Sequence, residues 1–142
     1  MIRKLEDEDI ESVMDIWLYG NMQAHWFINA DYWRRNYEIV CRDIKGSDVR
    51  VYEKDGKIAG FIGLNDDYIE GIFVACGCRS EGIGKELIDF AKTEHKHLSL
   101  AVYEKNARAI SFYKKEGFSV AKIRTDKDTG ETEFLMEWNK RI

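Results

Sequence analysis

The sequence predicts a single α/β domain built on a mixed sheet. Strand-like and helix-like segments alternate along the chain in the order βααβββαβαββ, a pattern typical of helices packed on a sheet. The 142 residues, 44% hydrophobic and 13% aromatic, are enough for one core and too few for two ordinary domains. No proline, repeat or Gly/Ser-rich linker interrupts the chain, so we expect residues 1–142 to form one domain.

Periodicity in the first half of the chain predicts a strand, two helices and a hairpin. Apolar residues recur after Ile10 at i+3, i+4, i+7 and i+8, as on one face of a helix. Asp55-Gly56 tolerates the positive φ of a two-residue turn and therefore predicts a hairpin. Residues 20–29 have no clear period and are predicted to form a mobile connection. The expected elements are a strand at 2–5, helices from 7 or 9 and from 31, and the hairpin at 49–64.

The second half predicts four strands and two helices. The helix after Gly82-Ile83-Gly84 carries apolar residues at a spacing of three or four, so one of its faces is expected to be buried. The other segments are short apolar runs bounded by polar turns. The expected elements are strands at 68–75, 98–103, 118–123 and 131–138, and helices after 82–84 and at 106–116.

The composition argues against several classes of protein. A net charge of −4 disfavours a general nucleic-acid binder, and the apolar runs are far shorter than the roughly 20 residues of a membrane span. The acidic N-terminal segment does not resemble a signal peptide, so a cytoplasmic location is expected. The three cysteines suit a reducing compartment. Cys76-x-Cys78 has no nearby histidine or third cysteine, so no metal site is expected.

The charges are unevenly distributed along the chain. Residues 1–15 contain two basic and six acidic side chains, whereas residues 101–124 contain six basic and two acidic ones. The basic segment indicates an anionic ligand near the later part of the chain. Solvated helix faces are the other interpretation of the same pattern.

A glycine-containing loop between a strand and a helix is a candidate phosphate site. The first N–H groups of a helix lack internal partners and carry the positive end of its dipole, and glycine lets a phosphate approach them closely. The alternative is that the glycines serve only a tight connection. The loop lacks the G-x-G-x-x-G fingerprint and the Gly-Lys-Ser/Thr ending of a P-loop. It consists of Arg79, Ser80, Glu81, Gly82, Ile83, Gly84 and Lys85.

A second motif follows about 22 residues later and carries Asn106, Ala109, Phe112, Tyr113, Gly117 and Phe118. Together the two motifs resemble the GCN5-related N-acetyltransferase (GNAT) family, whose loop is Q/R-x-x-G-x-G/A and whose later motif is N-x-x-A-x-x-F/L-Y-x-x-x-G-F. The resemblance covers nearly the whole chain and is strongest to small bacterial peptidyl-lysine acetyltransferases. It implies a mostly antiparallel sheet, splayed at its central strands, with about four helices.

The resemblance also implies how acetyl-CoA would be bound. The backbone at Phe73 and Val74 would bind the pantetheine arm and stabilise the oxyanion, and the backbone of residues 79–85 would take the pyrophosphate. Asn106 would reach pantetheine, cap the following helix, or do both. Tyr113 would protonate the departing thiolate as general acid; its spacing from Ala109 equally fits a core position.

The acceptor and the general base are less well determined. The position that holds a carboxylate in some family members is occupied by Tyr68. Glu70, acting through a water, is the candidate base, with a solvated carboxylate as the alternative, and His25 is a second titratable candidate. The acidic residue Glu70 and the aromatic residues Trp33 and Tyr68 suit a cationic amine as acceptor.

The resemblance favours a protein lysine that attacks acetyl-CoA directly in a ternary complex, with no metal, nucleic acid or membrane involved. Alternatives are small amines such as polyamines or aminoglycosides, aminoacyl-tRNA, a non-catalytic acyl-CoA sensor, and a Rossmann-type nucleotide protein. A covalent acetyl-cysteine route through Cys76 or Cys78 is a further alternative. The last strand, if exposed, would allow two copies to pair as a homodimer.

Overall fold

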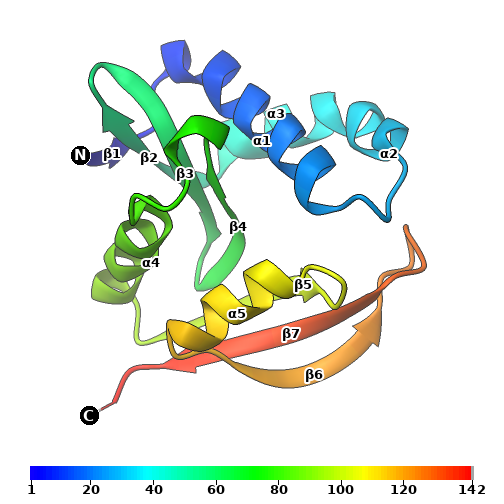
Figure 1. The fold of residues 1–142 in the computed structure, drawn as a ribbon. Coiled ribbons are helices and arrows are strands. Elements are labelled where there is room, and N and C mark those ends of the chain that lie inside the picture. Colours follow the sequence, from blue (N-terminus) through cyan, green and yellow to red (C-terminus); the bar gives the residue numbers. More distant parts are fainter. Residues whose placement is uncertain (142) are drawn as a thin grey trace.

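The computed structural model describes residues 1–141 as one mixed α/β unit (Figure 1). Its strands and helices follow the predicted order except for one additional helix. Short 3-10 turns precede α1 and follow β4, at Asp7–Asp9 and Cys76–Cys78. The elements are β1 (Ile2–Lys4), α1 (Ile10–Ala24), α2 (Ala30–Arg35), α3 (Tyr37–Gly46), β2 (Asp48–Lys54), β3 (Lys57–Asn65), β4 (Tyr68–Val74), α4 (Ile83–Glu94), β5 (His97–Tyr103), α5 (Ala107–Lys115), β6 (Ser119–Thr125) and β7 (Thr132–Asn139).

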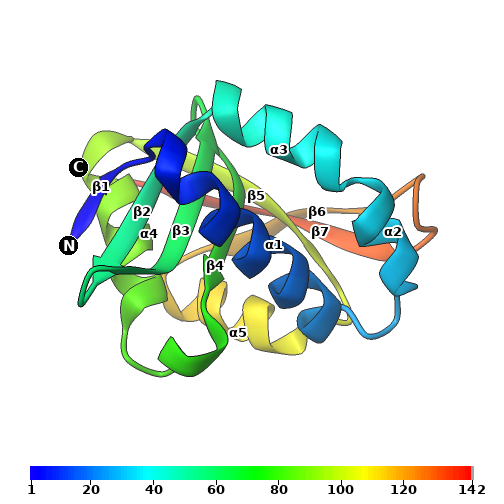
Figure 2. The ribbon, with the colours of Figure 1, turned by 90° about the horizontal axis from the view of Figure 1, so that it is seen from above.

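The strands form one sheet in the order β1-β2-β3-β4-β5-β7-β6. Neighbouring strands are antiparallel except β4 and β5, which are parallel. The helices α1, α2 and α3 lie on one face of this sheet and α4 and α5 on the other, as the two views show (Figures 1 and 2). Each face has its own hydrophobic core. The predicted mixed, mostly antiparallel sheet is confirmed.

Local sequence patterns account for the regular elements. In α4 the predicted apolar face is buried, with Leu87, Ile88 and Ala91 fully enclosed against the sheet. In β5 buried and half-buried residues alternate, as expected of a strand with one face on the core. Asp55 and Gly56 have φ values of 54° and 75°, so the β2–β3 turn has the positive-φ geometry that its sequence predicted.

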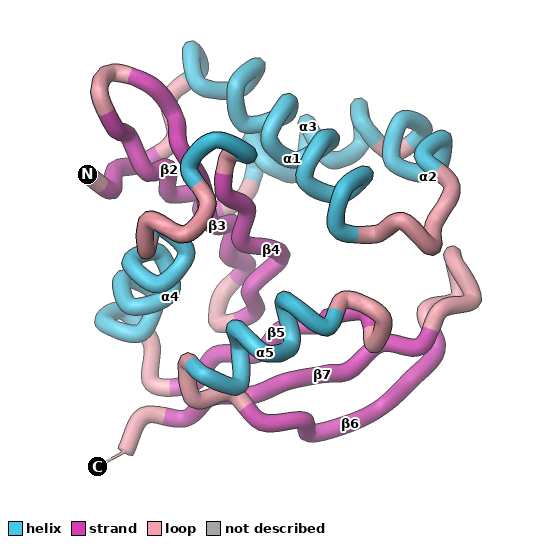
Figure 3. Tube along the Cα trace, viewed as in Figure 1, coloured by secondary structure: helices cyan, strands magenta, loops and turns pink. Residues whose placement is uncertain are grey.

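The central strands separate after two residue pairs. β4 and β5 pair only at Tyr68–Ser99 and Ile69–Leu100, and beyond these residues β4 has β3 as its only neighbour. A bulge lies at the same place, because Gly63 pairs with Gly71 whereas Leu64 pairs with Ile69, which leaves Glu70 as the extra residue. Figure 3 shows β4 diverging from β5. The predicted splay of the sheet is confirmed, and it begins at the bulge.

Three expectations for the helices and strands were wrong. The first half of the segment predicted to be a mobile connection is helical, since α1 continues to Ala24 and the buried Asn21 side chain donates to the Trp17 carbonyl at 2.9 Å. The single helix expected after Asp31 is divided at Asn36, whose side-chain amide donates to the Tyr32 carbonyl. The last strand, β7, is not an exposed edge: it lies between β5 and β6 and pairs with both. The pairing of two copies through it is therefore excluded.

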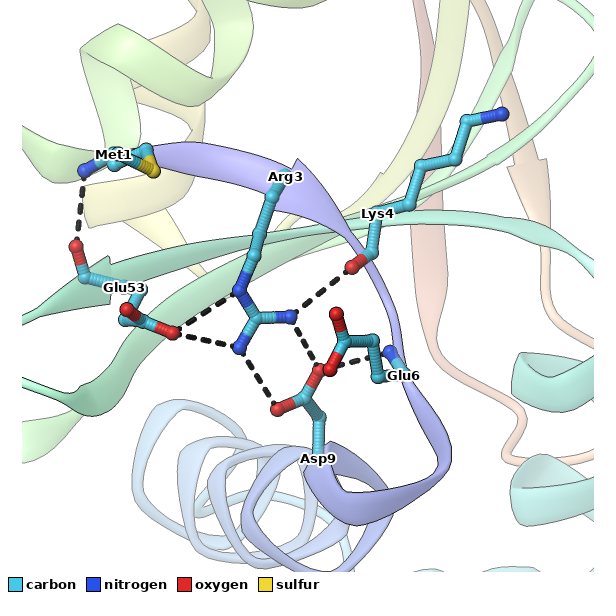
Figure 4. Close-up of polar contacts among 6 residues, drawn as sticks. All are labelled: Met1, Arg3, Lys4, Glu6, Asp9 and Glu53. Carbon is cyan, nitrogen blue, oxygen red and sulfur yellow. Dashed lines mark hydrogen bonds and ion pairs between the residues drawn. The ribbon is translucent and has the colours of Figure 1, made fainter.

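The start of the chain is held by a cluster of ionic hydrogen bonds between β1, β2 and the 3-10 turn before α1 (Figure 4). The Arg3 guanidinium donates to both carboxylate oxygens of Asp9, at 2.7 and 3.0 Å, and to Glu53 at 2.8 Å. The Glu6 backbone N–H also donates to Asp9, at 2.8 Å. Asp9 is buried, and its hydrogen bond with Arg3 lowers the pKa of its carboxyl.

Asp9→Ala is expected to destabilise the fold by about 2 kcal/mol at pH 7, because it leaves part of the Arg3 guanidinium without an acceptor. The folded-state pKa of Asp9 lies below its unfolded value, so this contribution is present above the unfolded pKa of about 3.9 and is lost as the pH falls through the folded pKa. Urea unfolding at pH 7 and in acid measures both effects, with the exposed Asp7→Ala as control. Equal midpoints for Asp9→Ala and wild type at pH 7 would contradict this assignment.

Candidate active site

The free edge of β4 offers backbone groups to an extended ligand. Residues 71–74 pair with β3 on one side and have no partner strand on the β5 side. Phe73 and Val74, the predicted pantetheine residues, lie in this stretch and are half-buried. An extended arm with amide groups, such as pantetheine, can add to such an edge as a strand does. The strand therefore fits the role expected of it.

The loop after β4 ends in an uncapped helix N-terminus. Gly82 occupies the N-cap position of α4 in the left-handed region (φ +81°), and no side chain caps the helix. A Cβ added to Gly82 would meet no protein atom within 4 Å, so the space beside it is open. The first N–H groups of α4 are thus available to an anion at the positive end of the helix dipole. Binding of a pyrophosphate by the backbone from Arg79 to Lys85 stays a prediction.

Charged side chains of this loop have partners within the protein. Glu81 is paired with Lys54 from β2, and the Arg79 guanidinium donates to the Gln23 side chain at 3.0 Å. Lys85 binds Asp89 at 3.0 Å and Glu116 at 3.4 Å. Ser80 is exposed with a φ of +68°, and Ile83 is buried in the core below. These charged side chains are therefore engaged within the protein, and the phosphate-binding role of the loop stays a prediction.

Tyr113 lies on α5 and is nearly buried, with 8% of its surface exposed. Its ring packs edge-on against Phe112 and Phe118, at centroid distances of 5.3 and 5.7 Å. Burial, and then the proximity of Tyr68, raise the pKa of its phenol above the usual value. Tyr113 therefore stays protonated at neutral pH and can act as a hydrogen-bond donor. Its core packing and a role as proton donor are compatible.

Asn106 joins two parts of the site. Its side-chain oxygen accepts from the Ala109 N–H at 3.2 Å, which is the N-cap interaction expected at the start of α5. Its side-chain amide donates to Nε2 of His25, at 3.2 Å, and so ties the α1–α2 connection to α5. The capping role is confirmed, and contact with pantetheine stays a prediction.

His25 is held neutral inside an aromatic cluster. Its ring stacks on Trp33 at 5.3 Å and meets the edge of Tyr103 at 5.1 Å. Burial lowers the pKa of His25 to about 4. Because Nε2 accepts from Asn106, we assign its proton to Nδ1. With Nε2 already occupied, His25 is better suited to holding the α1–α2 connection than to serving as general base.

A pocket of about 590 Å³ lies beside the diverging part of β4, between α2–α3 and the sheet. Trp33 and Glu70 both line it, and Glu70 is exposed. Tyr68 is a neighbour, since burial and then the charge of Glu70 raise the pKa of its phenol. The structure thus brings the predicted acceptor residues Trp33 and Tyr68 to Glu70, while His25 reaches them through its stack on Trp33.

The sequence analysis missed that the acidic β6–β7 turn lies near Tyr32 of α2 and Tyr103 of β5. The Tyr103 hydroxyl donates to Asp126 at 2.5 Å, and burial together with the charges of Asp126, Asp128 and Glu133 raises the pKa of Tyr32 on α2. Figure 1 shows the β6–β7 turn extending toward the α1–α2 connection. The three carboxylates are visible in the sequence, but no local pattern connects them with a helix about a hundred residues earlier.

Comparison with known proteins gives the family. The family model described as acetyltransferase (GNAT) domain matches residues 45–120, which is more than half of the chain and includes both the loop and the whole of the later motif. The chain belongs to the GNAT family. GNAT enzymes are acetyltransferases that use acetyl-CoA as donor, in agreement with the predicted donor and enzyme class.

Two relatives of this GNAT acetyltransferase are particularly similar. Peptidyl-lysine N-acetyltransferase YiaC of Escherichia coli K12 is 33% identical over 141 residues, which cover 97% of this chain and 96% of YiaC. The solution structure of apo YjaB from Escherichia coli superposes with a TM-score of 0.87 at 24% identity, covering 99% of this chain and 98% of YjaB. YncA of Salmonella typhimurium, solved with acetyl-CoA, has the same fold with a TM-score of 0.68 at 17% identity and coverage of 100% and 94%.

Two further observations concern residues 1–141 of this GNAT acetyltransferase. No cluster of three or more His, Cys, Asp or Glu side chains in this part of the chain could hold a metal ion. None of its helices is long and apolar enough to cross a membrane.

Proposed function

We propose that this GNAT acetyltransferase transfers the acetyl group of acetyl-CoA to the ε-amino group of protein lysines by direct attack. The observations that carry the proposal are the group of aromatic side chains and carboxylates around Tyr32, Tyr103 and Asp126 and the free edge of β4. Aromatic faces and carboxylates attract a lysine ammonium and its aliphatic stem. The relative YiaC is named a peptidyl-lysine N-acetyltransferase, which supports the same acceptor.

The chain's own groups supply the chemistry. At the Phe73–Val74 stretch of β4, the backbone N–H of Val74, which points away from β3, orients the donor and stabilises the oxygen that becomes negative when nitrogen attacks the carbonyl carbon. The carbon–sulfur bond then breaks, and the Tyr113 hydroxyl donates a proton to the departing sulfur. The backbone of residues 79–85 holds the pyrophosphate, and the Asn106 cap fixes the start of α5. The cysteines have no part in this route.

The amine has to lose a proton before it attacks. With a pKa near 10.4, about one lysine in a thousand is neutral at pH 7.4, a cost of about 4 kcal/mol. Glu70 is the general base that we propose, acting through a water, because it is exposed on the bulge where β4 leaves β5. His25 is engaged with Asn106 instead, and Tyr68 lacks a carboxylate.

Glu70→Gln is expected to lower kcat/KM at pH 7 at least tenfold. This reduction in kcat/KM should become smaller as the pH rises, because more of the acceptor amine is then already neutral. Initial rates from pH 6 to 10 with a lysine peptide measure the change, with Asp67→Asn, an exposed carboxylate in the β3–β4 turn, as the matched control. A Glu70→Gln profile that superposes on that of wild type would exclude Glu70 as the base.

The acceptor class is tested by incubating the enzyme and acetyl-CoA with a library of lysine peptides, polyamines and aminoglycosides, followed by mass spectrometry. We expect acetylation of lysine ε-amines in peptides, and rates at least tenfold lower for the small amines. Preferential acetylation of a polyamine or aminoglycoside would overturn the peptidyl-lysine proposal. Binding of acetyl-CoA without CoA release for any amine would instead indicate an acyl-CoA sensor.

A further inference from the structure

A second groove, separate from the pocket beside β4, is formed by α1, α2 and α3. These three helices contact one another on the same face of the sheet (Figure 2), and the groove between them has a volume of about 460 Å³. Its charged lining comes from the end of α2 and from α3, with three arginines against one glutamate among the described residues. The charged lining residues are Arg34, Arg35, Glu38 and Arg42.

Two of these arginines have guanidinium groups without an ionic partner. Within residues 1–141, Arg35 and Arg42 form no ion pair and donate no side-chain hydrogen bond, and both are exposed. Arg34, by contrast, donates to Asp31 of the same helix at 3.2 Å. A guanidinium carries five N–H donors in a planar fork that matches a carboxylate. The groove therefore contains positive charge and donors that suit carboxylates from another molecule.

The groove adjoins the pocket in which we place the acceptor. Arg42 lines both, and the pocket is also lined by Trp33 and the candidate base Glu70. A polypeptide whose lysine lies beside Glu70 can thus continue past Arg42 into the groove. Its lysine would then face a carboxylate, and its neighbouring residues would face two free arginines. Such an arrangement of opposite charges selects a partner with the complementary arrangement.

The carboxylates around the groove favour a short acidic segment over a long polyanion. Glu38 lies in the lining itself. Burial, and then the charge of Asp15 on α1, raise the pKa of Tyr37, so Asp15 lies near the α1 side of the groove. A nucleic acid crossing the groove would be repelled by these carboxylates and by the net charge of −4. A few acidic side chains can contact Arg35 and Arg42 alone.

We infer that this groove selects the acceptor protein: Arg35 and Arg42 bind aspartate or glutamate side chains close in sequence to the target lysine. The enzyme then prefers lysines that have acidic neighbours. The inference rests on the proposed function, because it names the class of protein lysine that the site takes. Leu18 and the exposed Ile39, which also line the groove, offer apolar contact to the stems of these side chains.

Paired peptides test this preference. Each pair has one lysine with a run of glutamates, placed before or after it at successive spacings, or with glutamines at the same positions. Exposed ion pairs contribute up to about fivefold each, so at the best spacing the acidic peptide should have a kcat/KM about fivefold higher than its neutral partner. This ratio should fall to twofold or less in Arg35→Gln/Arg42→Gln, and should fall in wild type at high salt.

Two further double variants show whether the effect belongs to the groove. Lys4→Gln/Lys57→Gln removes the same total charge from exposed lysines of β1 and β3, outside the groove, and should retain the wild-type ratio. Arg35→Glu/Arg42→Glu should reverse the preference, so that the neutral peptide becomes the better substrate. Because the ratio compares two substrates on one protein, a loss of folded enzyme cancels from it.

The other outcomes separate the two proposals. Equal kcat/KM values for the acidic and neutral peptides in wild type would overturn the role of the groove, as would a ratio that Arg35→Gln/Arg42→Gln does not change. Salt-sensitive binding of RNA that this variant loses, without any peptide preference, would assign the groove to a nucleic acid and overturn the inference as well. If wild type acetylates no lysine peptide of either kind, the proposed function itself fails.

Discussion

Tyr113→Phe should lower kcat about 100-fold, while KM for acetyl-CoA changes less than threefold. The substitution removes only the hydroxyl and preserves the ring that packs against Phe112 and Phe118. General-acid catalysis typically contributes 10²–10⁴-fold, and the departing thiolate would lose its proton donor. Because burial raises the pKa of Tyr113, the phenol stays protonated up to at least its usual value near 10, and its titration should not limit kcat below that pH.

Steady-state kinetics with a lysine peptide, following release of the CoA thiol, measure this effect. Tyr52→Phe is the matched control, since Tyr52 also packs against the core on the α4–α5 face but lies on β2. Thermal unfolding of both variants checks that the core is intact. Turnover of Tyr113→Phe at the wild-type rate would remove Tyr113 from the chemistry and leave it a core residue.

Gly82→Ala should weaken acetyl-CoA binding at least tenfold. The new Cβ would meet no protein atom within 4 Å, so it would enter the space that a bound pyrophosphate needs, and the positive φ would be strained for alanine. The same strain is expected to cost about 1 kcal/mol of stability. Isothermal calorimetry with acetyl-CoA measures the affinity.

Gly56→Ala separates strain from loss of the binding site. Gly56 has a similar φ, +75°, and equally open surroundings, but lies in the β2–β3 turn. Both variants should lose similar stability, and only Gly82→Ala should lose affinity for acetyl-CoA. Equal affinities in the two variants would mean that the pyrophosphate is not bound at the α4 N-terminus.

Much of the fold follows from local patterns. Asp55-Gly56 predicts its turn because few residue pairs accept two positive φ values, and α4 is predicted because its apolar residues recur with the helical period. The loop and the later motif likewise predict the family, as the match over residues 45–120 bears out. The N-cap role of Asn106 could also be predicted from local sequence, because the cap joins residues only three positions apart.

The missed features depend on contacts between distant segments. The division between α2 and α3 at Asn36 could not be predicted from the spacing of apolar residues, because it accompanies a hydrogen bond from the Asn36 side chain to the Tyr32 carbonyl. The partners of β7 could not be read from its own residues, which fit an edge or a central strand equally well. Likewise, hydrogen bonding to Asn106 makes His25 part of the joint between α1 and α5, although the sequence marked it only as titratable.

By itself, the sequence determined the family and the order of nearly all elements, because each depends on neighbours within one turn or one strand. Only the tertiary structure decided where β4 leaves β5, which carboxylates lie near Tyr32, and that a pocket adjoins Gly63 and Gly71. The physical reason is that a splay, a group of carboxylates and a pocket are each formed by segments far apart in the chain. Their positions are set by how the two sides of the sheet pack, which no local pattern encodes.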